Sequence, residues 1–96
     1  MRVINTNRIY VFSALTTNSI IFQANPRRKA FIIYNNGANI VEFLDNPNGL
    51  YGSGFPVKPT GVLSDDHFNP QGELYVIATG GTTELRVWEV ISQERR

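Results

Sequence analysis

The residues best suited to binding a metal ion lie together in the run Ser64-Asp65-Asp66-His67-Phe68, which contains the only histidine of the chain. In an extended strand, neighbouring side chains point to opposite faces, so one face would receive Asp65 and His67 alone. A catalytic zinc site needs three protein ligands and a structural zinc site needs four. We therefore predict no metal site and no cofactor, and we interpret this run as a strand end or a solvated turn.

Nucleophilic catalysis also lacks its usual context. Ser53 lies between two glycines in "YGSGF", but no serine stands in a G-x-S-x-G motif between a strand and a helix. A phosphate-binding loop would likewise need a helix to follow it. The glutamates in strand-like runs are explained as exposed positions: Glu42, Glu73, Glu84 and Glu89. We predict that the protein is not an enzyme.

A basic cluster, Arg27-Arg28-Lys29, is the one concentrated charge inside the chain. Together with the aromatic residues it suggests a binder of single-stranded nucleic acid. The net charge of only +1 and the core-like alternation of the aromatics argue against that function. We predict no nucleic-acid partner and interpret the cluster as a docking edge towards an acidic protein.

The segments that carry these residues have the sequence pattern of β-strands. Alternating apolar residues mark 8–15, 19–24, 30–34, 40–44, 61–68, 73–79 and 83–91, and no segment has the apolar spacing of a helix. Asn35-Asn36-Gly37 and Gly80-Gly81-Thr82 predict two hairpins, which join 30–34 to 40–44 and 73–79 to 83–91. We expect an all-β fold: a single-domain antiparallel sandwich or jelly-roll-like barrel of about 7–8 short strands.

Composition sets the wider limits. The 96 residues predict one domain, 1–96, with 42% hydrophobic residues to form its core. Only 18% are charged, which leaves a surface rich in Asn, Thr, Ser and Gly that suits burial against other proteins. Cysteine is absent, as expected for a protein made in a reducing compartment. No apolar run approaches membrane-spanning length, so we predict no membrane partner.

Two segments fall outside the strand pattern. Residues 1–7 contain Val3 and Ile4 among polar residues, and we expect either an N-terminal arm that packs on a neighbouring subunit or an unordered terminus. Residues 46–61 hold four glycines and three prolines, a loop length that is unusual in a compact domain and often functional. We expect Leu50, Tyr51 and Phe55 to dock on a partner or to fold back on the sheet.

The order of several short motifs resembles that of small all-β virion proteins of tailed bacteriophages. "PRRKAFIIYNNG" is followed by "VKPTG", then "GELYVIATGG", then "LRVWEV". The resemblance covers Pro26 to Ile91, about two thirds of the chain. Two departures concern loops: the tight Pro-Gly turn is here Pro59-Thr60-Gly61, and the insertion Tyr51–Phe55 is longer than usual.

The resemblance implies a structural role, namely an outer capsid decoration (cement) protein that clamps neighbouring subunits of the major capsid protein as a homotrimer. It places the protein on the outer capsid surface of the virion after synthesis in the host cytoplasm. Candidate interface residues are Val3, Ile4, Arg27, Arg28, Lys29, Leu50, Tyr51 and Phe55. The alternatives are a tail, neck or fibre component, or a carbohydrate-binding adhesin module that uses Tyr51, Phe55 and the Gly-rich loop. We interpret Trp88, which is flanked by alternating apolar residues, as a core or interface residue.

Overall fold

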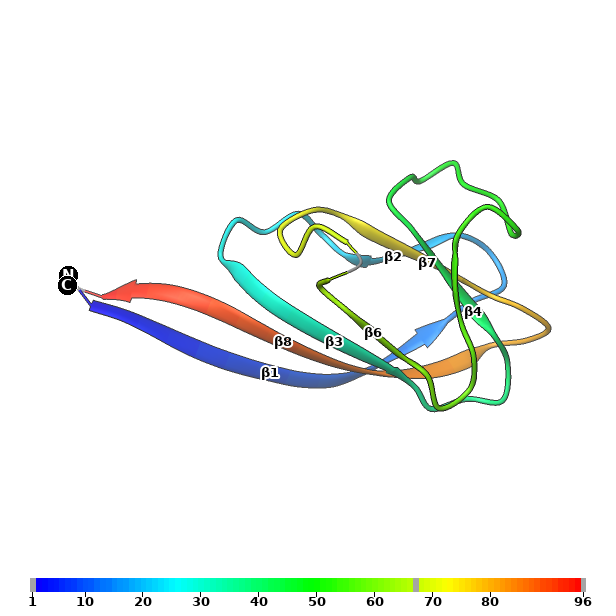
Figure 1. Cartoon of the computed structure of the whole chain (residues 1–96), viewed down its shortest axis with the longest axis horizontal. Helices are drawn as coiled ribbons and strands as arrows, with labels where there is room; N and C mark the ends of the chain where they lie inside the picture. Colours follow the sequence, from blue (N-terminus) through cyan, green and yellow to red (C-terminus); the bar gives the residue numbers. More distant parts are fainter. Residues whose placement is uncertain (1, 67, 96) are drawn as a thin grey trace.

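The computed structural model of the chain describes residues 2–66 and 68–95, and the side chains of residues 4–66 and 68–92. Eight strands and no helix form in this part of the chain (Figure 1). They are β1 (Arg2–Ala14), β2 (Ser19–Phe22), β3 (Arg28–Asn35), β4 (Val41–Leu44), β5 (Phe55–Val57), β6 (Val62–Ser64), β7 (Leu74–Ala78) and β8 (Thr83–Arg95). The all-β prediction is confirmed, although β1 and β8 reach 13 residues each and are not short.

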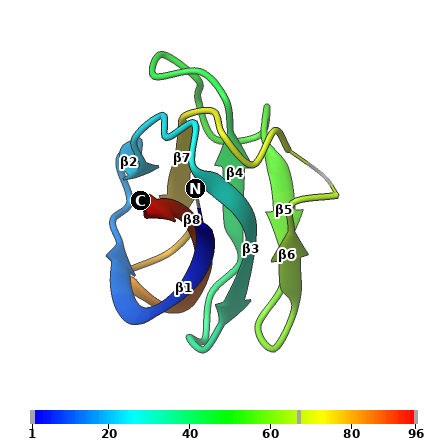
Figure 2. The ribbon, with the colours of Figure 1, turned by 90° about the vertical axis from the view of Figure 1, so that its left-hand side faces the viewer.

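The strands form two antiparallel sheets that pack face to face as a sandwich (Figure 2). Sheet A has the order β1-β8-β3-β6, and sheet B has the order β2-β7-β4-β5. In each sheet, the strand that comes last along the chain lies between two others: β8 in sheet A and β7 in sheet B. The pairing is therefore mostly between segments far apart in the sequence, as alternation of the chain between two sheets requires.

Both predicted hairpins are wrong, because the turns carry the chain from one sheet to the other. β3 belongs to sheet A and β4 to sheet B, and likewise β7 belongs to sheet B and β8 to sheet A. At the first corner, the Asn35 side chain donates to the Asn39 carbonyl (2.8 Å) and to the Val57 carbonyl (3.1 Å). At the second, Gly80 has a positive φ of 80°. The Asn and Gly residues that favour a hairpin turn therefore also suit a turn that connects two stacked sheets.

Residues 2–7 are not an unordered terminus, because β1 begins at Arg2 and pairs with β8 throughout. Packing of this segment on a neighbouring subunit stays a prediction. The register runs from Arg2 opposite Arg95 to Ala14 opposite Thr83. The N-terminal part of this ribbon extends beyond the sandwich, and Arg2 and Arg95 pair at its tip (Figure 1). Met1 lies outside the described residues. The ribbon explains the elongated dimensions of 48 × 24 × 19 Å.

The predicted long loop 46–61 is divided by a strand. β5 pairs with β4, so that Phe55 lies opposite Phe43 and Val57 opposite Val41. The fold-back alternative is thus correct for 55–57, while residues 45–54 remain a loop between β4 and β5. The predicted strand 61–68 is shorter than expected, because only β6 (62–64) pairs with β3 before the chain turns.

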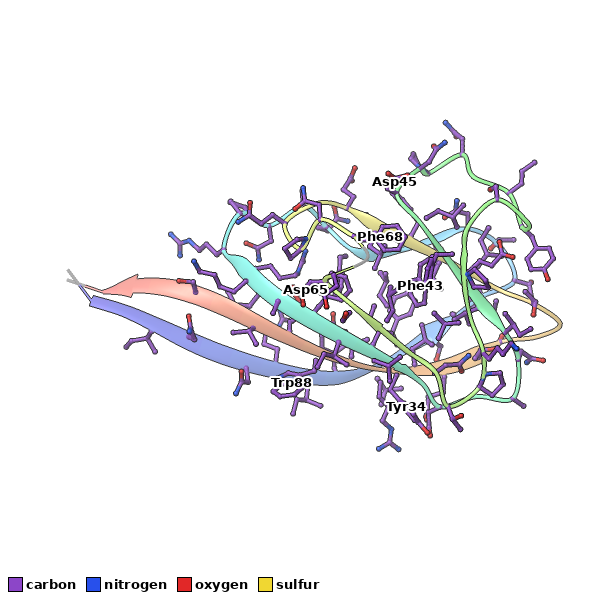
Figure 3. All side chains as sticks on the ribbon, viewed as in Figure 1. Tyr34, Phe43, Asp45, Asp65, Phe68 and Trp88 are labelled. Carbon is purple, nitrogen blue, oxygen red and sulfur yellow. The ribbon has the colours of Figure 1, made fainter. Side chains whose placement is uncertain are left out.

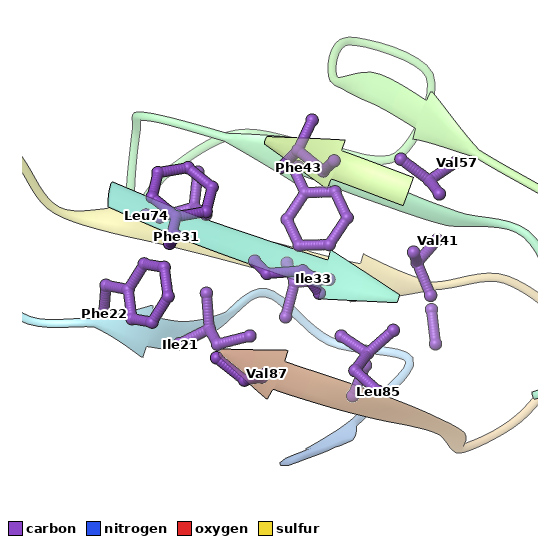
Figure 4. Packing of buried hydrophobic residues seen from close by; sticks show 14 residues of the cluster. Ile21, Phe22, Phe31, Ile33, Val41, Phe43, Val57, Leu74, Leu85 and Val87 are labelled. Atoms are coloured by element: carbon purple, nitrogen blue, oxygen red, sulfur yellow. The ribbon is translucent and has the colours of Figure 1, made fainter. Parts of the chain in front are cut away.

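The core is filled by the inward-facing residues of both sheets (Figure 4). Phe31 and Ile33 of β3 point inward as their alternation predicts, and Phe31 packs edge-on against Phe22 with ring centroids 5.1 Å apart. Leu85 and Val87 contribute from β8. From sheet B come Ile21, Phe22, Val41, Phe43, Leu74, Val76 and Ala78. Residues that alternate along each strand thus build one shared layer.

Candidate interaction surfaces

No metal-binding group is found in the described part of the chain, where no three His, Cys, Asp or Glu residues come together in a suitable way. His67 lies outside the described residues, so the Asp65/His67 pair is seen only in part. The Ser53 hydroxyl donates to the Leu50 carbonyl at 2.5 Å, which uses its proton to stabilise the loop. Within the described residues there is also no helix of the length and apolar character needed to cross a membrane.

The basic cluster is divided by the structure, because Arg28 points into the protein and is buried. Its Nε donates to the Glu89 carboxylate at 2.8 Å, and its two terminal nitrogens donate to the carbonyls of Pro70 (3.1 Å) and Gln23 (3.0 Å). The guanidinium also lies over the Phe22 ring, 4.2 Å from its centroid. The prediction that Arg28 is a docking residue is therefore wrong, because its charge is paired with that of Glu89 inside the fold.

Glu89 is the buried partner of this arginine and also accepts a hydrogen bond from the Tyr10 hydroxyl (2.7 Å). Burial raises the pKa of Tyr10 well above its usual value, and the hydrogen bond to Glu89 raises it further. A buried ion pair of this kind is costly to break, because the remaining charge would have no partner. The three side chains fasten β1, β3 and β8 to the turn at Pro70.

Arg27 and Lys29, on either side of Arg28, are exposed at the start of β3. The start of β3 lies nearer the ribbon end of the long axis, and the β4–β5 loop lies towards the other end (Figure 1). Ile4 is half-buried on β1 opposite Gln93, and the Val3 side chain lies outside the described ones. The candidate residues therefore do not form one continuous surface, and two cations of the cluster remain available to a partner.

The β4–β5 loop, residues 45–54, presents the most exposed apolar side chains among the predicted residues. Leu50 is 77% exposed and Tyr51 is 60% exposed. The loop is nevertheless held firmly in place. The buried Glu42 carboxylate accepts the amides of Gly52 (2.8 Å) and Gly54 (3.1 Å). Leu50 and Tyr51 thus extend into solvent from a loop whose backbone is held by hydrogen bonds to Glu42.

A second brace comes from the β1–β2 turn. The Asn18 side-chain amide donates to the carbonyls of Asn46 (3.1 Å) and Gly49 (3.0 Å). Gly49 lies so close to the sheet that an added Cβ would come within 2.3 Å of the Leu44 side chain. Bracing at both ends lowers the conformational entropy that the loop would lose on binding.

Phe55 belongs to β5 and packs edge-on against Phe68, with ring centroids 6.4 Å apart. The two rings line a cavity of about 310 Å³ together with residues of the loop, among them Asp45 and Ser53. Phe55 is therefore part of the wall beneath the loop, while Leu50 and Tyr51 form its outer edge.

A surface that sequence reasoning missed is the outer face of sheet A. Ile9, Trp88 and Ile32 lie side by side across three strands, and Val11, Arg86, Tyr34 and Val62 form the next row. Ile9 is 75% exposed and Trp88 is 42% exposed. A signal was present in the sequence, because β3 and β8 carry large apolar residues in both alternating positions. Such strands normally have both faces covered.

β1 also has an open edge, since it is the terminal strand of sheet A. Along its 13 residues, alternate N–H and C=O groups point away from β8, and no second strand of the described chain pairs with them. Long unpaired edges of this kind are templates for pairing with another chain.

Comparisons with known proteins support the fold alone. No protein-family model matches the chain, and no curated protein matches it. The chain is similar to a solved structure of Bacillus endospore appendages, reported as a novel family of disulfide-linked pili, with a TM-score of 0.56 and 13% sequence identity. The alignment covers 98% of this chain and 89% of the other. At this identity the likeness supports the sandwich fold and no specific activity.

Proposed function

We propose that the chain is a non-enzymatic structural protein of a tailed-phage virion, where it decorates the outer capsid and binds the major capsid protein. The observation that carries a binding role is the braced β4–β5 loop with its exposed Leu50 and Tyr51. The assignment to a phage capsid rests on the resemblance of the motif order from Pro26 to Ile91. On this proposal the protein is made in the host cytoplasm and resides on the virion surface.

The mechanism is clamping by several weak contacts. Fully burying a side chain such as Leu50 or Tyr51 contributes about 1.5–3 kcal/mol, so one loop binds weakly. A homo-oligomer, given as a trimer by the resemblance, presents several loops at once. After the first loop binds, the others bind at high effective concentration, and avidity can exceed single-site affinity by roughly 10²–10⁴. Arg27 and Lys29 add attraction towards acidic patches on the coat.

The test is co-sedimentation of the purified protein with mature, undecorated capsids. The double variant Leu50→Ser/Tyr51→Ser should lose capsid binding while its melting temperature stays unchanged, because both side chains are exposed in the isolated protein. Leu15→Ser, which changes an exposed apolar residue outside the loop, is the matched control and should bind normally. Wild-type protein that ignores capsids and leaves their heat stability unchanged would contradict the proposal.

A second candidate is a subunit of a filamentous surface appendage. It is favoured by the likeness to the endospore appendage structure over nearly the whole of both chains and by the open edge of β1. Because this chain has no cysteine, its subunits would have to join without disulfides. Electron microscopy of the concentrated protein separates the two candidates: filaments support an appendage, and discrete particles that bind capsids support decoration.

A further inference from the structure

The two sheets of the sandwich differ in how their outer faces are covered. On sheet B, Leu44, Tyr75 and Ile77 point outward and are nevertheless buried. The β4–β5 loop lies over this face, since Gly49 touches Leu44 and the loop amides bind Glu42. Sheet B is thus closed by its own chain.

Sheet A carries a comparable set of outward apolar residues without such a cover. We define the sheet A band as its five exposed members: Ile9, Val11, Ile32, Val62 and Trp88. Together they leave on the order of 500 Å² of apolar surface in water, at the upper end of the range for the largest patch on a monomer. The band faces away from the β4–β5 loop, with Trp88 and Tyr34 on one side of the molecule and the loop next to Asp45 on the other (Figure 3).

The band also contains a hollow. Ala30, Ile32, Trp88 and Val90 surround a groove of about 220 Å³ between β3 and β8, and its lining is apolar. A groove of this size accepts a branched aliphatic side chain. Ile9, the most exposed member of the band, is a side chain of that kind on the neighbouring edge strand.

The shape and the low net charge of this face indicate its occupant. Glu84 and Arg86 share the face of Trp88 by their spacing in β8 and have opposite charges, and Lys29 lies at the β3 bulge beside Ala30. A nucleic acid or an acidic surface would require an excess of cations. The face carries both a protruding Ile9 and a groove that accepts a side chain of that kind, so two copies related by a two-fold axis can each place Ile9 in the groove of the other.

We propose that the sheet A band is a homotypic interface on which a second copy of this chain packs through the same face. A stable interface buries about 800 Å² on each partner. The band supplies more than half of this area, and the polar residues around it, such as Asn7 and Ser64, supply a rim. The pairing leaves both β4–β5 loops on the outside of the dimer.

This inference concerns how copies meet, and it does not depend on what the loops bind. A face-to-face contact closes after two protomers, so it gives a dimer where the phage resemblance implies a trimer. Sedimentation velocity across a range of protein concentrations, without capsids, measures the stoichiometry. Trp88 is the only tryptophan, so its fluorescence reports directly on the interface and should shift to the blue as the dimer forms.

Substitutions in the sheet A band provide the decisive variants, because these side chains are exposed and can be changed without touching the core. Ile9→Lys should abolish the dimer, whereas Leu50→Ser on the loop should leave it intact.

A monomer at all concentrations, with no shift in Trp88 emission, would overturn the inference. A trimer that persists in Ile9→Lys, or association lost equally in Leu50→Ser, would also overturn it. None of these results bears on capsid binding, which the loop variants test separately.

Discussion

Removing the guanidinium of Arg28 should cost more stability than any change at a neighbouring cation. Arg28→Met deletes hydrogen bonds to the Glu89 carboxylate and to the carbonyls of Pro70 and Gln23, with lengths of 2.8, 3.1 and 3.0 Å. It also leaves the buried Glu89 carboxylate with the Tyr10 hydroxyl as its remaining hydrogen-bond donor among the described residues. Breaking a buried pair in this way costs about 3–5 kcal/mol.

That loss is large against the about 5–15 kcal/mol by which a domain is stable. For a chain of this size, 1 kcal/mol shifts the melting temperature by about 4–8 °C, so the variant should melt roughly 12–40 °C below wild type. Urea unfolding followed by circular dichroism gives the free energy directly. Arg27→Met, which removes the adjacent exposed cation, is the control and should change stability by less than about 1 kcal/mol.

The double variant Arg28→Met/Glu89→Met distinguishes the buried charge from the lost hydrogen bonds. With both charges removed, the cost of the unpaired carboxylate disappears, and much of the stability should return. A coupling energy of about 1–3 kcal/mol in the double-mutant cycle is expected. If Arg28→Met unfolds at the wild-type urea concentration, or if the two single costs simply add, the reasoning about this pair is wrong.

Three further predictions concern the loop and the tyrosine. Glu42→Ala should ease local opening of the β4–β5 loop by about 1–2 kcal/mol and speed its proteolysis, whereas Glu42→Gln keeps an acceptor for the loop amides and should stay near wild type. Gly49→Ala should destabilise by about 1–3 kcal/mol because its Cβ would strike Leu44, while Gly72→Ala meets only ordinary contacts and should be neutral in the same urea titration. The raised pKa of Tyr10 means that the folded state holds this proton more tightly than the unfolded state. Its contribution is therefore constant below about pH 10 and is lost as the pH rises further, so wild type should lose stability relative to Tyr10→Phe only in that alkaline range.

The inward or outward direction of strand residues could be predicted from the sequence, because alternation is a local property. Phe31 and Ile33 face the core, and Ile32 faces out, as their spacing indicates. Which strands pair could not be predicted, since Asn35-Asn36-Gly37 suits a hairpin and a corner between sheets equally well. The start of β1 could not be predicted either, because Asn5-Thr6-Asn7-Arg8 is an unbroken polar run without alternation.

Among the candidate site residues, the burial of Arg28 could likewise not be predicted from the sequence. Its neighbours Arg27 and Lys29 are exposed, and nothing local distinguishes the residue between them. Its partner Glu89 is 61 positions away and is brought near only by the pairing of β3 with β8. For Leu50 and Tyr51 the sequence leaves docking on a partner and fold-back on the sheet both open, because the glycines around them offer no cover, and the structure leaves both side chains exposed.

The position of β8 determines when this protein can fold. β8 is the last strand in the sequence, yet it lies between β1 and β3 inside sheet A. At synthesis rates of about 5–20 residues per second, β1 is complete several seconds before its partner exists. Until then, β1 has no partner and β3 can pair only with β6, so both strands have an open edge, a state prone to aggregation. Sheet A is therefore completed only after β8 has left the ribosome, and a chain truncated before β8 would lose the partner of β1 and one of the two partners of β3.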